Sequence, residues 1–172
     1  MRLPVTCVEY GLTIKSAFFT LPSMPRTALV VPVREAAPYY AGAPGVPAHV
    51  TVLFPFDETP DEQALEDLFR RFHAFDFELD SVEQFAEGTR WLHPSPSAPF
   101  VDLTAAVWQR WPDYAPYEGA FDEVIPHLTI TVDDVQGLPI RARATEVALL
   151  EESESDGSWS VRRTFALGQG VA

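Results

Sequence analysis

The sequence predicts a single α+β domain with antiparallel or mixed sheets. Strand-like runs occur before, between and after two helical segments, in an order typical of hairpins. The 172 residues are 47% hydrophobic and 22% charged, which is the balance of one globular domain able to bury a core. No stretch of the sequence is a linker long enough to separate two domains.

The first two predicted strands flank a loop. Thr27–Val33 is a β-branched apolar run, typical of a buried strand. Residues 34–48 are so rich in proline and glycine that we expect no regular element there. His49–Pro55 alternates as a strand should. Its expected core face is Val50, Val52 and Phe54, and its opposite face is His49, Thr51 and Leu53.

Two amphipathic helices are predicted. The first has Thr59 as N-cap, Pro60 at its first helical position and Glu62 completing a capping box. The second lies between Ser97 and Trp111, and Pro112 ends it. The apolar stripes are Leu65, Leu68, Phe69 and Phe72 in the first helix, and Phe100, Leu103, Val107 and Trp111 in the second.

Four further runs have strand-like patterns. They are Phe75–Leu79, His127–Val132, Glu146–Leu150 and Trp159–Leu167. The polar residues 151–158 are expected to form a hairpin turn between the last two. In the second of these runs the alternation directs Leu128, Ile130 and Val132 inward, and His127, Thr129 and Thr131 outward.

The first 26 residues form an extension of uncertain status. Glu9 and Lys15 interrupt its apolar stretch, and no small-x-small cleavage site follows, so we do not expect an export signal. On that basis the expected location is cytoplasmic. Two interpretations stay open: translation starts at Met24, or residues 6–14 form an additional hairpin.

The composition excludes several classes of function. Acidic residues outnumber basic ones by 25 to 12, for a formal charge of −13, which disfavours wrapping of a long nucleic acid. The single Cys7 excludes an internal disulfide framework and a cysteine-rich metal site. No run approaches 18 apolar residues, so no membrane span is expected.

A His-x-Thr motif occurs twice, and each copy opens a predicted strand. The copies are His49-Val50-Thr51 and His127-Leu128-Thr129, with Pro47 and Pro126 shortly before them. Side chains two residues apart on a strand leave from the same face, so each motif presents an imidazole beside a hydroxyl. Two such strands side by side would surround one concavity with both pairs.

This set of groups suits the opening of a cyclic phosphodiester. One histidine can take a proton from the attacking hydroxyl while the other protonates the leaving oxygen. Threonine hydroxyls can bind the charged oxygens of the transition state. The scheme requires no metal and no cofactor. A single His-x-Thr would be weak evidence, and coincidence or a site that only binds its ligand is the alternative to a shared active site.

The remaining candidates have weaker signals. Tyr117 could stack on a base or hydrogen-bond a ligand, or it could simply pack in its loop. Arg90 could reach a phosphate, although exposed arginines are common. His73, on the polar flank of the first helix, and His93, in a turn-like segment, are expected to have surface or structural roles.

The repeated motif, within the segments GVPAHVTVLFPF (residues 45–56) and YEGAFDEVIPHLTITV (residues 117–132), resembles the 2H phosphoesterase superfamily in its 2'-5' RNA ligase-like branch. The resemblance covers Thr27 to Gly168. It implies one bilobal domain over residues 27–168, followed by a tail at residues 169–172. The implied fold has two pseudo-symmetric lobes of mostly antiparallel sheet, with flanking helices, around a central cleft.

By the same resemblance, His49 and His127 would be the acid/base pair, and Thr51 and Thr129 would bind phosphate. The implied activity is hydrolysis of a 2',3'-cyclic phosphate or a related cyclic phosphodiester, in RNA processing. The alternatives are a non-catalytic nucleotide- or RNA-end-binding domain and 2'-5' RNA end joining. We expect a monomer with a small nucleotide or an RNA end as its partner and no membrane. Residues 133–144 look too short and too broken for a long helix, so the second lobe is expected to be trimmed.

Overall fold

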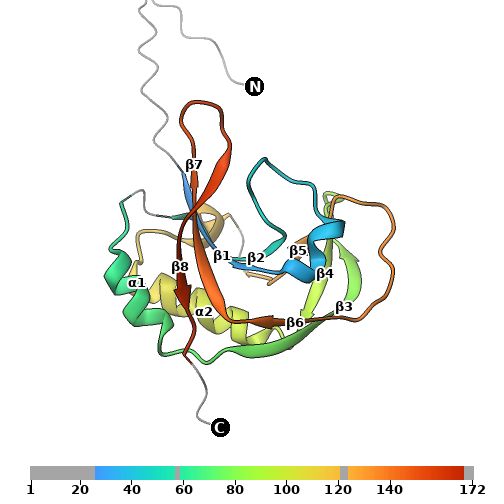
Figure 1. Cartoon of the computed structure of the whole chain (residues 1–172), viewed down its shortest axis with the longest axis horizontal. Coiled ribbons are helices and arrows are strands. Elements are labelled where there is room, and N and C mark those ends of the chain that lie inside the picture. The colour runs from blue at the N-terminus through green and yellow to red at the C-terminus, as the bar shows by residue number, and fades with distance from the viewer. Residues whose placement is uncertain (1–25, 57–58, 121–123, 169–172) are drawn as a thin grey trace, which may run out of the picture.

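The computed structural model describes residues 26–56, 59–120 and 124–168, so the possible N-terminal hairpin and the C-terminal tail lie outside the described residues. Two four-stranded antiparallel sheets make up most of the structure (Figure 1). The strands of the first, in spatial order, are β2 (His49–Phe56), β1 (Thr27–Pro32), β7 (Glu146–Glu152) and β8 (Trp159–Ala166). Those of the second are β5 (Leu128–Thr129), β4 (Arg90–Ser95), β3 (Phe75–Gln84) and β6 (Ile140–Ala144). The predicted two-lobed α+β class is confirmed.

Two α-helices and two short 3₁₀ helices accompany the sheets. The α-helices are α1 (Glu62–Phe69) and α2 (Ala98–Arg110), and the 3₁₀ helices are η1 (Arg34–Tyr39) and η2 (Pro116–Gly119). The helix α1 packs against β8, and α2 packs against β2. Among the described residues, no helix is long and apolar enough to cross a membrane.

The helix α2 fastens the two sheets to each other. Its Phe100 meets Phe75 and Phe77 of β3 edge-to-face, with ring centroids 5.1 and 5.0 Å apart. On the other sheet, the buried Thr104 hydroxyl donates a hydrogen bond of 2.8 Å to the Val52 carbonyl oxygen of β2. The strand that begins with His49 is therefore held by a helix that also packs on the second lobe.

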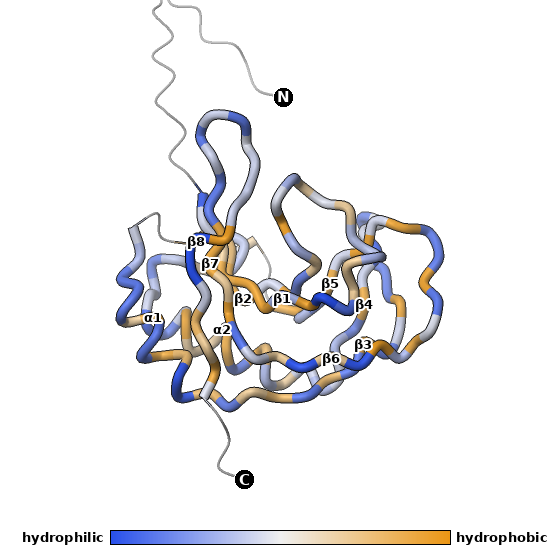
Figure 2. Tube along the Cα trace, viewed as in Figure 1, coloured by the Kyte–Doolittle hydropathy of each residue, from blue (hydrophilic) through white to orange (hydrophobic). Residues whose placement is uncertain are grey.

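One hydrophobic core runs beneath both sheets. The buried side chains of β1, β2, β7, α1 and α2 join those of β3 and β4 in a single cluster. Figure 2 shows the central strands β1 and β7 as hydrophobic stretches, whereas α1 is largely hydrophilic on its outer side. The buried stripe positions Leu65, Phe69, Phe100, Leu103 and Val107 confirm the predicted inward faces of the helices.

The alternation predicted for β2 is wrong beyond Val52. The pairing register with β1 shifts between Leu29↔Leu53 and Val30↔Thr51, so the strand has one extra residue there. As a result Leu53 lies in the main core, and Phe54 packs with Trp159 on the opposite side. Phe54 is thus on the face of His49 and Thr51, which the regular alternation did not indicate.

The structure corrects four further expectations. The helix α1 begins at Glu62, and Asp61 is its N-cap in place of Thr59, because the Asp61 carboxylate accepts a 3.0 Å hydrogen bond from the Ala64 amide. Residues 34–39 form η1, although no regular element was expected there. The strand predicted at His127–Val132 contains only Leu128–Thr129. His73 lies beyond the end of α1, in a bridge to Gly168.

The strands β4 and β6 were not predicted. The prolines at positions 94 and 96 made the β4 region look like a turn. In β6, residues 140–144 alternate, and their arginines meet acidic partners across β3: Arg141 pairs with Glu78 at 2.9 Å and Arg143 with Asp76 at 2.8 Å. Residues 133–144 contain no helix, which agrees with the expected trimming of the second lobe.

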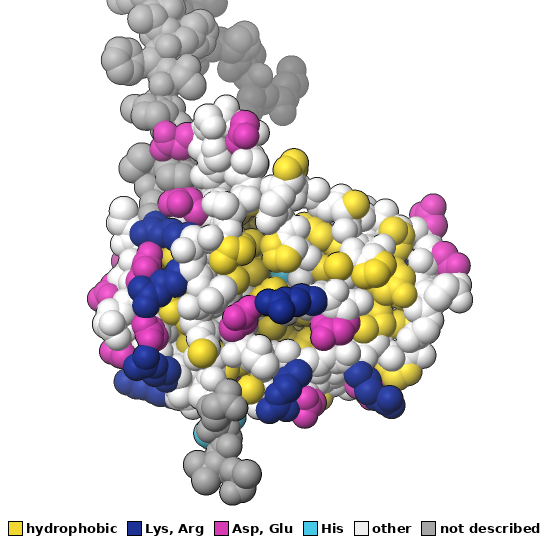
Figure 3. Space-filling model, in the orientation of Figure 1, with side chains coloured by type: hydrophobic (Ala, Val, Ile, Leu, Met, Phe, Trp, Pro, Cys, Tyr) yellow, Lys and Arg dark blue, Asp and Glu magenta, His cyan; other side chains and the backbone are white. Residues whose placement is uncertain are grey.

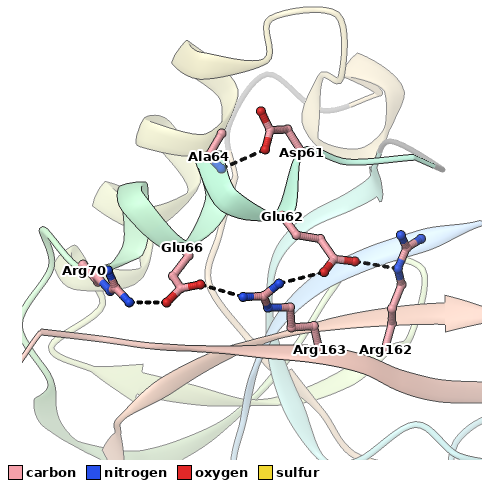
Figure 4. A network of polar contacts seen from close by, with 7 residues as sticks. All are labelled: Asp61, Glu62, Ala64, Glu66, Arg70, Arg162 and Arg163. Carbon is pink, nitrogen blue, oxygen red and sulfur yellow. Dashed lines mark hydrogen bonds and ion pairs between the residues drawn. The ribbon is translucent and has the colours of Figure 1, made fainter.

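A charged network joins α1 to β8 (Figure 4). Glu62 accepts from both Arg162 and Arg163, at 2.9 and 3.0 Å, and Glu66 accepts from Arg163 at 2.6 Å. Arg70 also contacts Glu66 from the next turn of the helix. Because these groups are partly exposed, the network orients α1 on the sheet more than it stabilises the fold.

We predict that Thr104→Val lowers the free energy of unfolding by about 1–2 kcal/mol, because the buried Val52 carbonyl loses its donor while the side-chain volume is retained. Urea denaturation followed by circular dichroism measures this change. The matched control is Thr145→Val at an exposed position, which we expect to stay within about 0.5 kcal/mol of the wild type. Equal effects of the two substitutions would contradict the assigned role of Thr104.

Candidate active site

The two His-x-Thr motifs meet at the contact between the two sheets. The strands β2 and β5 are the edge strands of their sheets, and they lie against each other. His49 is the first residue of β2, and His127 immediately precedes β5. The two histidines are close enough for the charge on His127 to lower the pKa of His49. The structure thus brings together the pair that the sequence predicted.

Each imidazole is oriented by the same kind of contact, with a backbone carbonyl oxygen two residues before it. The Nδ1 atom of His49 lies 2.7 Å from the carbonyl oxygen of Pro47, and Nδ1 of His127 lies 2.7 Å from that of Ile125. A carbonyl oxygen can only accept a hydrogen bond, so each Nδ1 carries a proton and donates it. In the neutral ring, Nε2 then has the free lone pair, so each Nε2 is the atom able to exchange a proton.

Burial lowers the pKa of both histidines below the ordinary value. For His49, burial is the largest cause, the Pro47 carbonyl opposes it, and the charge on His127 lowers the pKa further. For His127, burial again has the largest effect, and the Ile125 carbonyl and the charge of Glu87 oppose it. Both rings are therefore mainly neutral at pH 7, and a protonated ring becomes populated as the pH falls.

Aromatic rings pack against both imidazoles. Tyr40 meets His49 edge-on at 5.7 Å. Phe85 and Trp91 meet His127 at 5.0 and 5.9 Å, and they stack on each other. The sequence analysis did not identify these three residues as neighbours of the histidines. Of the three, only Trp91 is linked to a motif by strand pairing: it is the cross-strand partner of Thr129, so both side chains lie on the same face of the sheet.

A cavity of about 200 Å³ lies beside His49 and Thr51. The rest of its lining is mainly apolar: Ala28, Val30, Val46, Phe54, Tyr117, Leu150 and Trp159. A larger hollow of about 520 Å³ shares Phe54 and Tyr117 with it. Figure 3 shows hydrophobic side chains gathered over the middle and right of the visible face, with a basic side chain flanked by acidic ones at its centre and further charged side chains along the edges. The cavity is thus suited to an apolar or aromatic group.

Of the weaker candidates, the structure places Tyr117 in the site and gives Arg90 another contact. Tyr117 lines the cavity together with Thr51, and burial raises the pKa of its hydroxyl. Arg90 Nη1 donates to the carbonyl oxygens of Val132 and Asp133, at 3.1 and 2.7 Å, and so braces the backbone after β5. Phosphate binding by Arg90 stays a prediction.

The other two described histidines lie apart from this constellation. His73 is exposed at its bridge to Gly168. His93 is on β4, where its Nδ1 lies 3.0 Å from an Asp80 carboxylate oxygen and its ring is 6.1 Å from Trp91. These contacts agree with the surface and structural roles expected for them.

Two lobes of antiparallel sheet with a paired histidine and threonine on each facing edge define a phosphoesterase of the two-histidine type. The profile of the 2'-5' RNA ligase superfamily matches residues 21–165, and the chain belongs to this superfamily of 2H phosphoesterases. Among curated proteins, no sequence matches the chain at a significant level.

Solved structures with this fold share little sequence with the chain. Escherichia coli LigT in its apo form has a TM-score of 0.58 and 21% identity, over 86% of this chain and all of LigT (100%). A crystal structure of a phosphoesterase has a TM-score of 0.59 and 19% identity, over 84% of this chain and 98% of its own. The TT0787 protein of Thermus thermophilus has a TM-score of 0.54 and 16% identity, over 85% and 100%. At these identities the likeness shows the fold.

Proposed function

We propose that this protein is a metal-independent cyclic phosphodiesterase that opens a 2',3'-cyclic phosphate, or a related cyclic nucleotide phosphodiester, by two-histidine catalysis. The observation that carries the proposal is the shared arrangement of His49 and His127. In each ring, Nδ1 contacts a backbone carbonyl oxygen and Nε2 is available. His49 begins β2 and His127 immediately precedes β5, and each of these strands also presents a threonine.

The proposed reaction assigns one proton transfer to each of the two rings. A neutral imidazole takes a proton from water through Nε2 as the water oxygen attacks phosphorus. The bond from phosphorus to one ribose oxygen breaks, and the protonated imidazole gives its proton to that oxygen. The hydroxyls of Thr51 and Thr129 would donate to the non-bridging oxygens, where negative charge increases. The product is a phosphomonoester with a free neighbouring hydroxyl.

The solved complexes of the similar LigT protein support a nucleotide ligand. Crystal structures of E. coli LigT hold 3'-AMP in one case and phosphate in another. In the present protein, the apolar cavity beside Thr51 could hold the base of such a nucleotide while its phosphate lies between the two motifs.

The superfamily match also favours a second candidate function, 2'-5' RNA end joining. It would use the same groups, with a ribose hydroxyl in place of water as the nucleophile that attacks phosphorus, while the bond from phosphorus to the ribose leaving oxygen breaks. A non-catalytic nucleotide- or RNA-end-binding domain is the alternative from a different class. Tight binding of long RNA is disfavoured by the formal charge of −13. A small nucleotide or an RNA end is therefore the proposed substrate.

We predict hydrolysis of 2',3'-cyclic nucleotides in the presence of EDTA. His49→Ala and His127→Ala should each lower kcat/KM at least about a hundredfold, because each removes a proton-transfer group. Chromatography of the nucleotide products measures the rates. The control is His73→Ala, which removes an exposed histidine and should leave the rate unchanged. Nucleotide binding without turnover of any cyclic phosphodiester would favour the binding-domain alternative.

The pH dependence of kcat/KM should be bell-shaped, with its maximum below pH 6.5. Burial lowers both histidine pKa values from 6.5, so the pairing of one neutral and one protonated ring is most populated at a more acidic pH. The rate at pH 6 should therefore exceed the rate at pH 8. Initial rates measured across this range under subsaturating substrate test the prediction, and a maximum above pH 7.5 would contradict it.

Replacing either threonine by valine should lower kcat/KM by about tenfold, a smaller effect than loss of a histidine. Each substitution removes one donor to a charged phosphate oxygen while keeping the β-branched shape that fits the strand. The measurement is kcat/KM for Thr51→Val and Thr129→Val on the same cyclic nucleotide. Wild-type rates in both variants would rule out the proposed phosphate contacts.

A further inference from the structure

Two hollows lie next to each other along β2. The smaller, of about 200 Å³, is lined by His49 and Thr51, and the larger has a volume of about 520 Å³. Phe54 and Tyr117 line both, so the two hollows share a wall. The smaller volume is below the roughly 300–1,000 Å³ of pockets that enclose a drug-sized ligand, whereas the larger is within that range. A ligand bigger than a single base therefore has room to extend from the smaller hollow into the larger one.

Aromatic rings form much of the wall of the larger hollow. The rings of Phe56 and Tyr114 contact each other there, with centroids 5.4 Å apart. Aromatic side chains stack on nucleobases of every kind, because each base has a π-face. The larger hollow is thus suited to an uncharged aromatic group. Its full lining is Arg26, Phe54, Pro55, Phe56, Tyr114, Tyr117, Glu118 and Ala120.

Features of the backbone place the two residues that the hollows share. The register shift in β2 turns Phe54 to the side of His49 and Thr51. Tyr117 has φ 50° and ψ 37°, and Glu118 has φ 56° and ψ 24°, in the left-handed region that residues with a Cβ adopt rarely. Such conformations cluster at functional sites, where the surrounding structure must hold a side chain in one place. The wall between the hollows therefore depends on specific local structure in β2 and η2.

The opposite side of the candidate site is less suited to a further nucleotide. Glu83 is the cross-strand partner of Trp91, and Trp91 is that of Thr129, so Glu83 lies on the face of the second motif. On the same face, the Asp80 carboxylate lies beside His93, two residues from Trp91. Both carboxylates belong to exposed residues and would repel the phosphate of an additional nucleotide. Extension of a ligand along β2 is therefore favoured.

We propose that the larger hollow is a second subsite, which binds the base of the nucleotide preceding the one that carries the cyclic phosphate. The smaller hollow then takes the terminal base, and the phosphodiester that joins the two nucleosides passes the shared wall of Phe54 and Tyr117. The substrate class is thus an RNA 3' end of at least two nucleotides, or a free dinucleotide, in preference to a mononucleotide. This inference rests on the proposed function of the site.

Comparison of a mononucleotide with a dinucleotide substrate tests the proposal. In the wild type, kcat/KM for adenylyl-adenosine 2',3'-cyclic phosphate should exceed that for 2',3'-cyclic AMP about tenfold, because one more base is stacked. Tyr114→Ala removes a ring that lines the larger hollow and not the smaller, so the ratio of the two values should fall to about one. Tyr114→Phe keeps the ring and should keep the ratio. The control for loss of a ring is Trp108→Ala, at an exposed position of α2 outside the lining of both hollows, which should also keep the ratio.

A second variant tests the same subsite without removing a packed side chain. Ala120 is exposed and lines the larger hollow, so Ala120→Trp fills that space with little risk to folding. It should also lower the ratio of the two kcat/KM values to about one. Equal values for the two substrates in the wild type, or equal losses on both substrates in Tyr114→Ala and Ala120→Trp, would overturn the proposal.

Binding of phosphomonoesters gives a readout that does not depend on turnover. In titration calorimetry, the wild type should bind adenylyl-adenosine 3'-phosphate about tenfold more tightly than 3'-AMP, and Tyr114→Ala should bind the two equally. If no cyclic phosphodiester is hydrolysed but this difference in affinity is present, the proposed function fails and the second subsite stands. If both substrates are hydrolysed at the same rate and both phosphomonoesters bind equally, the second subsite fails alone.

Discussion

The contact between β2 and β5 is the constraint on which the candidate site depends. His49 and Thr51 lie on β2, whereas Thr129 lies on β5 and His127 immediately before it, so neither sheet contains both pairs. Edge strands are suited to this contact, since each has one side free of a sheet neighbour. Several interactions hold them in place. The helix α2 packs on both sheets, and the Thr131 amide and hydroxyl bind Tyr39 and Ala41 just before β2. The cleft is therefore built into the core that the two lobes share.

Within that contact, backbone carbonyls and burial set the chemistry of the imidazoles. The carbonyl two residues before each histidine fixes its tautomer, and burial keeps the rings mainly neutral at pH 7. In the described residues near the two rings, no carboxylate has the role of orienting an imidazole. A neutral carbonyl can fix a ring nitrogen without favouring the charged form of the ring as strongly as a carboxylate would.

The distribution of positive charge fits a small ligand better than a long one. Arg162 and Arg163 are engaged with α1, and Arg141 and Arg143 with β3. Arg26, which borders the larger hollow, is bound by Glu152 through two hydrogen bonds of 2.6 and 2.8 Å. The basic side chains of these elements are thus held in ion pairs with carboxylates of the protein itself.

The amino-acid sequence by itself determined the class of fold, the amphipathic faces of both helices and the two His-x-Thr motifs that the structure brings together. These features depend on local periodicity and on short motifs, which can be recognised in the sequence without knowledge of the tertiary structure. The sequence also contains the alternation of Arg141 and Arg143, which pair with Glu78 and Asp76 of β3. This alternation would have predicted β6. Other features were decided by the tertiary structure. The register shift in β2 moved Leu53 into the core and Phe54 to the site, because strand pairing, and not alternation alone, sets which way a side chain points. The position of Tyr117 in the cavity beside Thr51 likewise depends on how η2 folds back against β2, and no local pattern encodes that placement.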